Sequence, residues 1–265
     1  MMLPSDAPLF LPCYHQCAGR HDLLNSQTVA NSAKSREQTT KPLSPFMAVL
    51  KGAANLCPFL GANGISATAN HASERFSEAF HEWRMGIRTA GKIEMSALGI
   101  TDPFAKNYYP TDYRSIFKAF RYITSDGSFL DYGCGMGRVL AVAAMHPFKR
   151  VIGVEISSEL TEIARDNLVR CRKCCGSTEV ITLSADQYVV PSDVTTIFFY
   201  NPFVGPVLSL VFRNIKQSIA IQPRKLTIVF KNTDYLRGAD IDGWLVKTAE
   251  FAACDNTHKI AVFKT

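Results

Sequence analysis

Short apolar runs of strand length recur along the second half of the chain, and apolar residues at helical spacing lie between them. The runs end at polar or turn-forming residues. They cover residues 128–130, 151–155, 179–183, 195–200 and 226–230. Apolar residues at helical spacing lie within residues 139–143, 158–171 and 206–215. An alternation of strands and helices predicts an α/β fold with a mostly parallel sheet.

The last two apolar runs are connected differently. Residues 244–251 and 259–263 are joined only by the turn-like stretch Asp255-Asn256-Thr257. Two strands joined by so short a turn pair antiparallel as a hairpin. The sequence therefore predicts a doubly wound, mostly parallel seven-stranded sheet with a C-terminal antiparallel hairpin.

The pattern before the first strand divides the chain into regions. Residues 1–44 lack sustained periodicity and are followed by predicted helices at 46–60 and about 73–88. A polar stretch without periodicity predicts a disordered or loose arm. We therefore expect an arm over 1–44, a helical N-terminal extension or lid over 45–108, and the α/β domain over 109–265.

A polar and aromatic segment, residues 107–113, stands directly before the first strand. Thr111 or Asp112 can cap a helix that runs to about residue 122. A loop in this place lies over the carboxyl ends of the strands, where open α/β sheets bind ligands. We therefore expect this segment to cover a ligand site.

The stretch from Asp131 to Arg138, Asp-Tyr-Gly-Cys-Gly-Met-Gly-Arg, joins the first strand to a helix. Glycines permit close backbone approach, and the first turn of a helix offers unpaired N–H groups. Such a turn predicts a site for a polar ligand. It is not the dinucleotide pattern G-x-G-x-x-G/A, because Arg138 stands three positions after Gly135. The alternative is a purely structural strand–helix turn.

Glu155 ends the second strand, 24 positions after Asp131. This is close to the spacing at which a carboxylate reaches the ribose hydroxyls of a nucleotide cofactor. The alternative is that Glu155 only caps the following helix, for which Ser157 and Ser158 are good N-cap residues. The two roles are compatible.

Composition and charge add few constraints. The 265 residues are 47% hydrophobic and 20% charged, as in ordinary globular proteins. The net charge of +6, without a dense basic block, permits an acidic or nucleic-acid partner but does not indicate one. No apolar run approaches the roughly 18 residues of a membrane helix, so we expect no membrane span. We expect an intracellular, cytoplasmic protein, and organelle targeting by the N-terminal arm stays open.

Eight cysteines are present, and three of them cluster at Cys171, Cys174 and Cys175. A fourth, Cys134, lies inside the glycine turn, where a disulfide would be obstructive. No second pair with zinc-site spacing follows, so we expect no metal site and reduced thiols.

Four strand ends together resemble those of the class I, seven-stranded S-adenosylmethionine-dependent methyltransferases. They are the D-x-G-x-G-x-G stretch from Asp131, Glu155, Asp186, and Asn201-Pro202-Phe203. The resemblance covers about residues 109–265. It implies a Rossmann-like fold, S-adenosyl-L-methionine as cofactor and S-adenosyl-L-homocysteine as product. The segments around Tyr109 and Asn201 further resemble uncharacterised, mainly bacterial members. A more distant likeness is to the seven-stranded histone lysine methyltransferases, although this chain has Pro202 inside the last motif.

The resemblance also implies residue roles. Asp131 and the backbone of Gly133, Gly135 and Gly137 would hold the methionine part of the cofactor. Glu155 would bind the ribose, and Asp186 the adenine amino group. Asn201 would face the transferred methyl, while Tyr109 and Thr111 would close the site from above. The implied catalytic residues are thus Asn201 and Tyr109.

The acceptor is inferred from the surroundings of Asn201. An amine acceptor must be neutral, and the Asn201 carbonyl can accept its hydrogens next to Pro202, which has no N–H. Aromatic walls suit an aliphatic amine; the candidates are Trp83, Tyr108, Tyr109, Tyr113 and Phe203. We expect N-methylation, with a protein lysine as the leading acceptor. The alternatives are aromatics that form only the core of the lid, and an Asn-Pro pair that only ends a strand.

Other acceptors and functions stay open. A small molecule is one alternative, and a methyltransferase-like binding module without turnover is another. Adenine and glutamine-amide methyltransferases typically carry Asn-Pro-Pro-Tyr, whereas this chain has Phe203 and Val204 in the last two places. The base-stacking platform is therefore incomplete, and nucleic acid ranks below protein and small molecules.

Overall fold

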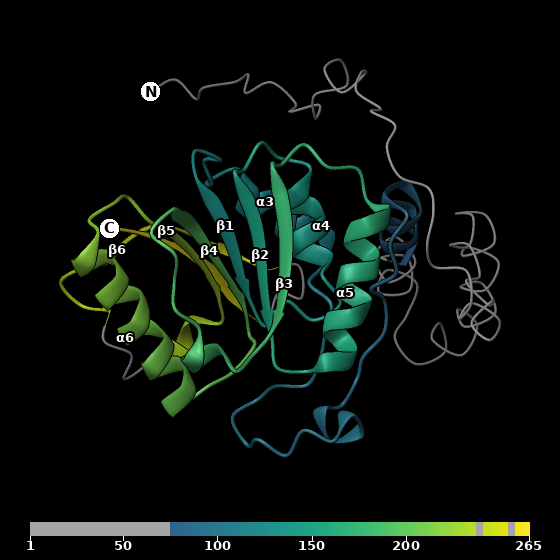
Figure 1. Ribbon diagram of the computed structural model, residues 1–265, viewed down its shortest axis with the longest axis horizontal. Coiled ribbons are helices and arrows are strands. Elements are labelled where there is room, and N and C mark those ends of the chain that lie inside the picture. Colours follow the sequence, from purple (N-terminus) through teal and green to yellow (C-terminus); the bar gives the residue numbers. More distant parts are fainter. Residues whose placement is uncertain (1–74, 237–240, 254–257) are drawn as a thin grey trace, which may run out of the picture. The chain divides into compact units, whose positions relative to one another are not determined.

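The computed structural model describes residues 75–236, 241–253 and 258–265 (Figure 1). The predicted arm over 1–44, the predicted helix over 46–60 and the turn at residues 255–257 lie outside the described residues. The boundaries proposed at 44/45 and 108/109 stay predictions.

Seven strands form a single sheet in the order β3-β2-β1-β4-β5-β7-β6. The strands are β1 Ser128–Tyr132, β2 Arg150–Glu155, β3 Ser177–Thr182, β4 Val194–Tyr200, β5 Thr227–Lys231, β6 Val246–Ala252 and β7 Lys259–Lys264. The first five run parallel, and β7 pairs antiparallel with both β5 and β6. The predicted mostly parallel sheet with a C-terminal antiparallel pair is confirmed.

Helices cover both faces of this sheet (Figure 1). They are α3 Tyr113–Phe120, α4 Arg138–Ala144, α5 Ser158–Arg170 and α6 Pro206–Ile221, with the 3-10 turns η1 Met95–Leu98, η2 Ala185–Gln187 and η3 Thr233–Leu236. A further helical segment covers residues 75–85. Residues of α3, α4 and α5 pack with Phe129 on one face, and residues of α6 pack with Leu130 on the other. Both faces are buried, which explains the nearly continuous apolar runs of the central strands.

Helix starts follow the predicted capping residues. The Asp112 carboxylate accepts a hydrogen bond from the Ser115 amide at 2.7 Å and begins α3. The Ser157 hydroxyl accepts one from the Leu160 amide at 3.3 Å and begins α5. Each cap satisfies an amide that has no partner inside its helix. Among the described helices, none is long and apolar enough to cross a membrane.

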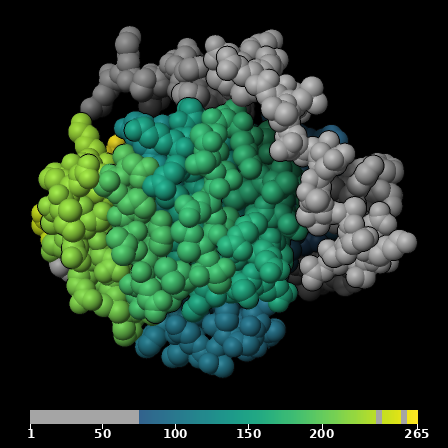
Figure 2. Space-filling model, in the orientation of Figure 1, coloured from purple at the N-terminus to yellow at the C-terminus, as the bar shows by residue number. Residues whose placement is uncertain are grey.

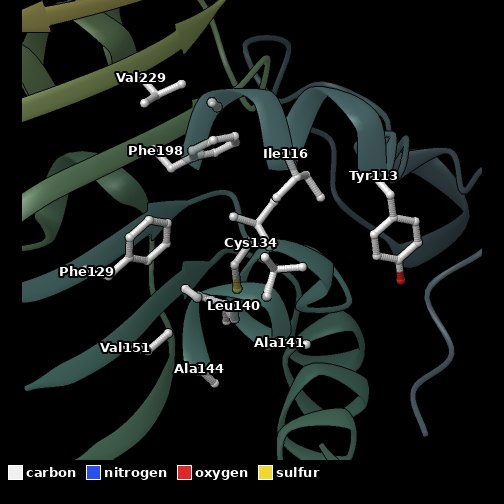
Figure 3. Close-up of a cluster of buried hydrophobic side chains, with 14 of the residues drawn as sticks. Tyr113, Ile116, Phe129, Cys134, Leu140, Ala141, Ala144, Val151, Phe198 and Val229 are labelled. Atoms are coloured by element: carbon white, nitrogen blue, oxygen red, sulfur yellow. The ribbon is translucent and has the colours of Figure 1, made fainter. Parts of the chain in front are cut away.

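The glycine turn is packed tightly onto the neighbouring strand. A Cβ added at Gly153 of β2 would lie 2.5 Å from Leu140 Cδ1 and 2.7 Å from Cys134 Sγ. Figure 3 shows Cys134 and Leu140 within the apolar cluster between α4 and the sheet. Burial raises the pKa of the Cys134 thiol, so the group behaves as a small apolar side chain. Only glycine at 153 leaves room for the turn in this position.

The strand order places a crevice between β1 and β4. From β1 the chain adds β2 and β3 on one side, and β4 and β5 on the other. The connections diverge at this point and leave a crevice at the carboxyl ends of the strands. Residues around η1 lie at this end of the domain, because Ala105 bridges to Phe203 and Ile93 bridges to Tyr108. They form the blue surface at the lower edge of Figure 2.

Candidate active site

A cavity of about 700 Å³ lies at the carboxyl ends of β1, β2 and β4. It brings together six of the nine predicted site residues: Tyr109, Thr111, Asp131, Gly133, Glu155 and Asn201. Gly135, Gly137 and Asp186 do not line it. The roles predicted for all nine stay predictions, but the structure shows what each side chain contacts.

The three glycines of the turn all have left-handed backbone conformations, with φ of 69° at Gly133, 52° at Gly135 and 80° at Gly137. Side chains are strained in this region. Space is limited as well, since a Cβ at Gly133 would lie 2.2 Å from Pro202 Cβ. At Gly135 it would lie 2.3 Å from Cε2 of Tyr108. Glycine at positions 133 and 135 therefore leaves room for the residues that cover the turn. The Tyr108 ring lies directly against Gly135.

Glu155 is held in place by backbone amides. Its Oε2 accepts from the Gly135 amide at 2.9 Å, and its Oε1 accepts from the Ser157 amide at 3.0 Å. The N-cap of α5 is Ser157, not Glu155. An ionised carboxylate has about four acceptor positions. Each Glu155 oxygen therefore keeps acceptor capacity for a hydroxyl in the cavity.

Asp131 is a buried carboxylate, only 3% exposed, beside Glu155. In residues 75–236, 241–253 and 258–265 no hydrogen-bond donor reaches its side chain. Burial raises the pKa of Asp131 well above its usual range, and the negative charge of Glu155 raises it further. Burial also raises the pKa of Glu155, while the amides of Ser157 and Gly135 lower it. Two buried acids side by side suit a cationic ligand.

Asp186 lies next to the cavity rather than in it. Its carboxylate accepts a short hydrogen bond from the Ser184 hydroxyl, and its backbone carbonyl accepts one from Asn214 Nδ2 at 2.7 Å. Ser184 and Ala185, the two residues before it, line the cavity instead. A contact of the Asp186 side chain with adenine stays a prediction.

Asn201 combines backbone strain with an unsatisfied polar atom. Its φ is 60°, which is uncommon for a residue other than glycine. Within the described part of the chain, its buried Oδ1 has no hydrogen-bond donor. Strain and an unpaired buried acceptor each cost free energy, and together they are typical of functional sites. Asn201 also ends β4, as the alternative interpretation predicts, and the two readings are compatible.

The part of the cavity beside Asn201 contains three further polar residues, of which the sequence pattern indicated only Asp112, as a helix cap. Lys231 Nζ donates to the Tyr200 hydroxyl at 2.7 Å and lies 4.1 Å from the centre of its ring. The Tyr200 hydroxyl in turn donates to Asp112 Oδ2 at 3.2 Å. Tyr200 and Lys231 are partners in the β4–β5 register, whereas Asp112 comes from the segment before β1. Only the strand order and register could have brought them together.

The aromatic residues divide into walls and core. Tyr109 is 53% exposed and lines the cavity, with Lys92 5.0 Å from the centre of its ring. Tyr113 lines the cavity too, but it packs against His81 and Phe117. Trp83 is 47% exposed and does not line the cavity, so its prediction as a wall is wrong. It lies on the outer side of the helical segment 75–85, whose inner side carries Glu78 and Glu82.

The cysteines described by the structure are free thiols. Cys171 is buried, Cys175 is half-buried and Cys174 is exposed. Over the described ranges, no three His, Cys, Asp or Glu side chains are grouped to hold a metal ion.

Comparison with known proteins supports one class for the domain. Residues 130–217 match the family described as a methyltransferase domain. Together with the seven-stranded topology, this match supports a class I S-adenosylmethionine-dependent methyltransferase domain with S-adenosylmethionine as its cofactor. The search of curated protein sequences returns no match.

Solved structures of similar fold include three methyltransferases. An RNA methyltransferase from Salinibacter ruber, in complex with S-adenosyl-L-homocysteine, is 18% identical over 59% of this chain and 93% of its own, with a TM-score of 0.45. The N-methyltransferase NodS from Bradyrhizobium japonicum is 15% identical over 57% and 94%, with a TM-score of 0.41. A TehB-like SAM-dependent methyltransferase from Corynebacterium glutamicum is 15% identical over 56% and 84%, with a TM-score of 0.40.

Proposed function

We propose that this protein transfers the methyl group of S-adenosylmethionine to an amine nitrogen. The observation that carries the proposal is that Asn201 lines the same cavity as two buried carboxylates, and that its side-chain oxygen has no hydrogen-bond partner among the described residues. The carboxylates suit a cationic cofactor, and the carbonyl suits an acceptor that has N–H groups to donate.

The residues at the cofactor end fit S-adenosylmethionine. Asp131 has no hydrogen-bond donor among the residues that the structure describes, and it would accept from the ammonium group of the methionine part. Glu155 would accept from the ribose hydroxyls, and Gly133 leaves its backbone open to the cavity. When bound, the cofactor supplies a methyl group already activated by a sulfonium. The chain therefore has to align the acceptor and exclude water rather than create a nucleophile.

At the acceptor end, Asn201 would orient the amine. A hydrogen bond from the amine to Asn201 Oδ1 fixes the direction of the nitrogen lone pair. Pro202 has no N–H that could compete for this oxygen. The amine must be neutral to react, and its proton leaves to water or to a nearby carboxylate. Asp112 is such a group, because its Oδ2 lies within reach of the Tyr200 hydroxyl in the cavity wall.

A lysine of a protein is the leading acceptor in this proposal. Its methylene chain would pack on the ring of Tyr109 at the mouth and on Phe203, while its nitrogen reaches Asn201. The half-exposed Tyr109 supports an acceptor that enters from solvent. A small-molecule amine would use the same contacts and is the alternative acceptor.

The test compares two asparagines with the same backbone conformation. Asn232 has a φ of 65° and is buried, but it does not line the cavity. Glycine accepts this conformation without strain, so Asn201→Gly and Asn232→Gly should both fold. Titration calorimetry with S-adenosylmethionine and S-adenosylhomocysteine measures cofactor binding. Labelled methyl transfer to lysate proteins and small amines measures turnover.

We expect both variants to bind the cofactor and only Asn232→Gly to transfer the methyl group. Equal turnover in the two variants would remove Asn201 from the mechanism. Cofactor binding by the unaltered chain without any labelled product would favour a binding module. Label on oxygen, carbon or nucleic-acid bases, with amines unlabelled, would refute the amine proposal and leave the fold untouched.

A further inference from the structure

Residues 75–113, which we call the cover, precede β1 and carry Tyr109 and Thr111 to the cavity. They include the helical segment 75–85, the turn η1 and the first residue of α3. Arg138 also lines the cavity, and it is the first residue of α4, directly after Gly137. Its side chain is only 2% exposed. A buried guanidinium needs partners for its donors, and these partners are informative.

In the described part of the chain, every partner of the Arg138 side chain belongs to the cover. Nε donates to Thr89 Oγ1 at 2.7 Å, and Nη1 donates to the Thr111 carbonyl at 2.9 Å. Nη1 and Nη2 pair with Glu78 and Glu82, each at 3.1 Å. The guanidinium also lies 4.6 Å from the centre of the Tyr113 ring. One side chain at the glycine turn therefore contacts three separate parts of the cover, namely the helical segment 75–85, Thr89 and residues 111–113.

Thr89 takes part in a second connection between the cover and the glycine turn. It is completely buried, and both its amide and its hydroxyl donate to Glu82 Oε1 at 2.7 Å. Its carbonyl accepts from the Tyr108 hydroxyl at 2.7 Å. The ring of that tyrosine lies against Gly135. The cover is thus attached on both sides of the turn, through Arg138 after Gly137 and through Tyr108 at Gly135.

The cluster is part of the cavity wall. Glu78, Tyr108, Thr111, Tyr113 and Arg138 all line the cavity. Separating the cover from the turn would open the wall and expose Arg138 and its two carboxylate partners. Lysine could replace the charge of Arg138 but not its planar set of donors, which reaches four groups at once.

We infer that Arg138 is a positioning residue for cofactor binding: it holds the cover on the glycine turn and so keeps Tyr109 and Thr111 over the cavity. The inference rests on the proposed function, because it assigns the cavity to S-adenosylmethionine. In this arrangement the bound cofactor leaves only after the cover has separated from Arg138. The dissociation rate should therefore depend on residues that do not contact the cofactor.

The test measures the dissociation rate of S-adenosylhomocysteine from the full-length chain, together with amide hydrogen exchange. The variants are Arg138→Lys and Thr89→Val, since both keep the size of the side chain and remove part of the cluster. The matched control is Arg150→Met, which breaks another arginine–carboxylate pair, to Asp193, that does not line the cavity. Glu82→Gln serves as the second variant of the cluster if Arg138→Lys does not fold.

We expect dissociation to become about tenfold faster in the two variants, and to stay within about twofold of the unaltered chain in the control. Residues 75–85 and 108–111 should exchange faster in the variants, whereas β1 and β4 should not. Unchanged dissociation and exchange in Arg138→Lys and Thr89→Val would overturn the inference. If the unaltered chain does not bind S-adenosylhomocysteine, the proposed function fails. In that case amide exchange still tests whether Arg138 attaches the cover to the glycine turn. Unchanged exchange of the cover in the variants would refute the attachment, and faster exchange would support it.

Discussion

Two clusters of buried charge lie on opposite sides of the glycine turn, and they differ in how their charges are balanced. Around Arg138, one cation meets two carboxylates and two further acceptors, so its donors have partners within the chain. At the strand ends, Asp131 and Glu155 are two acids without a cation among their described contacts. The charges of the first cluster are balanced within the folded chain, whereas the second cluster lacks a cation that a cationic ligand would supply. The first should therefore support the structure, and the second should support binding.

The largest effect should come from breaking the cluster around Arg138. Arg138→Met leaves Glu78 and Glu82 without their partner, and removing one member of a buried ion pair costs about 3–5 kcal/mol of unfolding free energy. Denaturant unfolding measures this loss. Arg150→Met should cost less than about 1 kcal/mol, because its pair with Asp193 is partly exposed. Equal losses in the two variants would remove the distinction between the sites.

Asp131→Asn should separate binding from stability. It removes a buried charge that lacks a partner, so the unfolding free energy of the ligand-free chain should stay unchanged or rise. The affinity for S-adenosylmethionine should fall by about 2–3 kcal/mol, the usual value of a hydrogen bond to a charged group. Calorimetry and denaturant unfolding of the same preparation measure both quantities. A loss of stability without a loss of affinity would show that Asp131 is structural.

Glu155→Gln should have a smaller effect on binding. The amide oxygen of glutamine can still accept from one of the two backbone amides that hold Glu155, so we expect the turn to keep its conformation. One acceptor for the ribose hydroxyls is lost, which should weaken cofactor binding by about 1–2 kcal/mol. Titration with S-adenosylhomocysteine checks this value. Unchanged affinity would show that Glu155 only holds the backbone of the turn and does not bind the cofactor.

The pH dependence of binding sharpens the contrast. Because the folded-state pKa of Asp131 is raised, its protonated form stabilises the ligand-free fold, and this contribution is lost as the pH rises through that pKa. A cationic cofactor favours the ionised form. Its affinity should therefore increase with pH by up to about tenfold per unit below the raised pKa. Titrations at several pH values should show this slope, and the slope should be reduced in Asp131→Asn.

The sequence by itself determined the sheet and several of the strand-end residues that line the cavity. Apolar runs of strand length, helical spacing between them and the caps Asp112 and Ser157 predicted elements that the structure confirms. Asp131, Gly133 and Glu155 could be located for the same reason, since polar residues at the ends of parallel strands meet at one edge of the sheet. These features follow from local pattern and topology alone.

Only the tertiary structure decided the contacts of the cover and the residues that surround Asn201. Trp83 was predicted as a wall because it is one of several aromatic residues before the first strand, yet the sequence cannot say which of these face the cavity. Arg138 appears in the sequence only as the residue that breaks a dinucleotide pattern, and its partners lie 27 to 60 positions away. Lys231 and Tyr200 meet through strand register. Long polar side chains find their partners through packing between distant segments, and no local pattern of hydrophobicity encodes which segments those are.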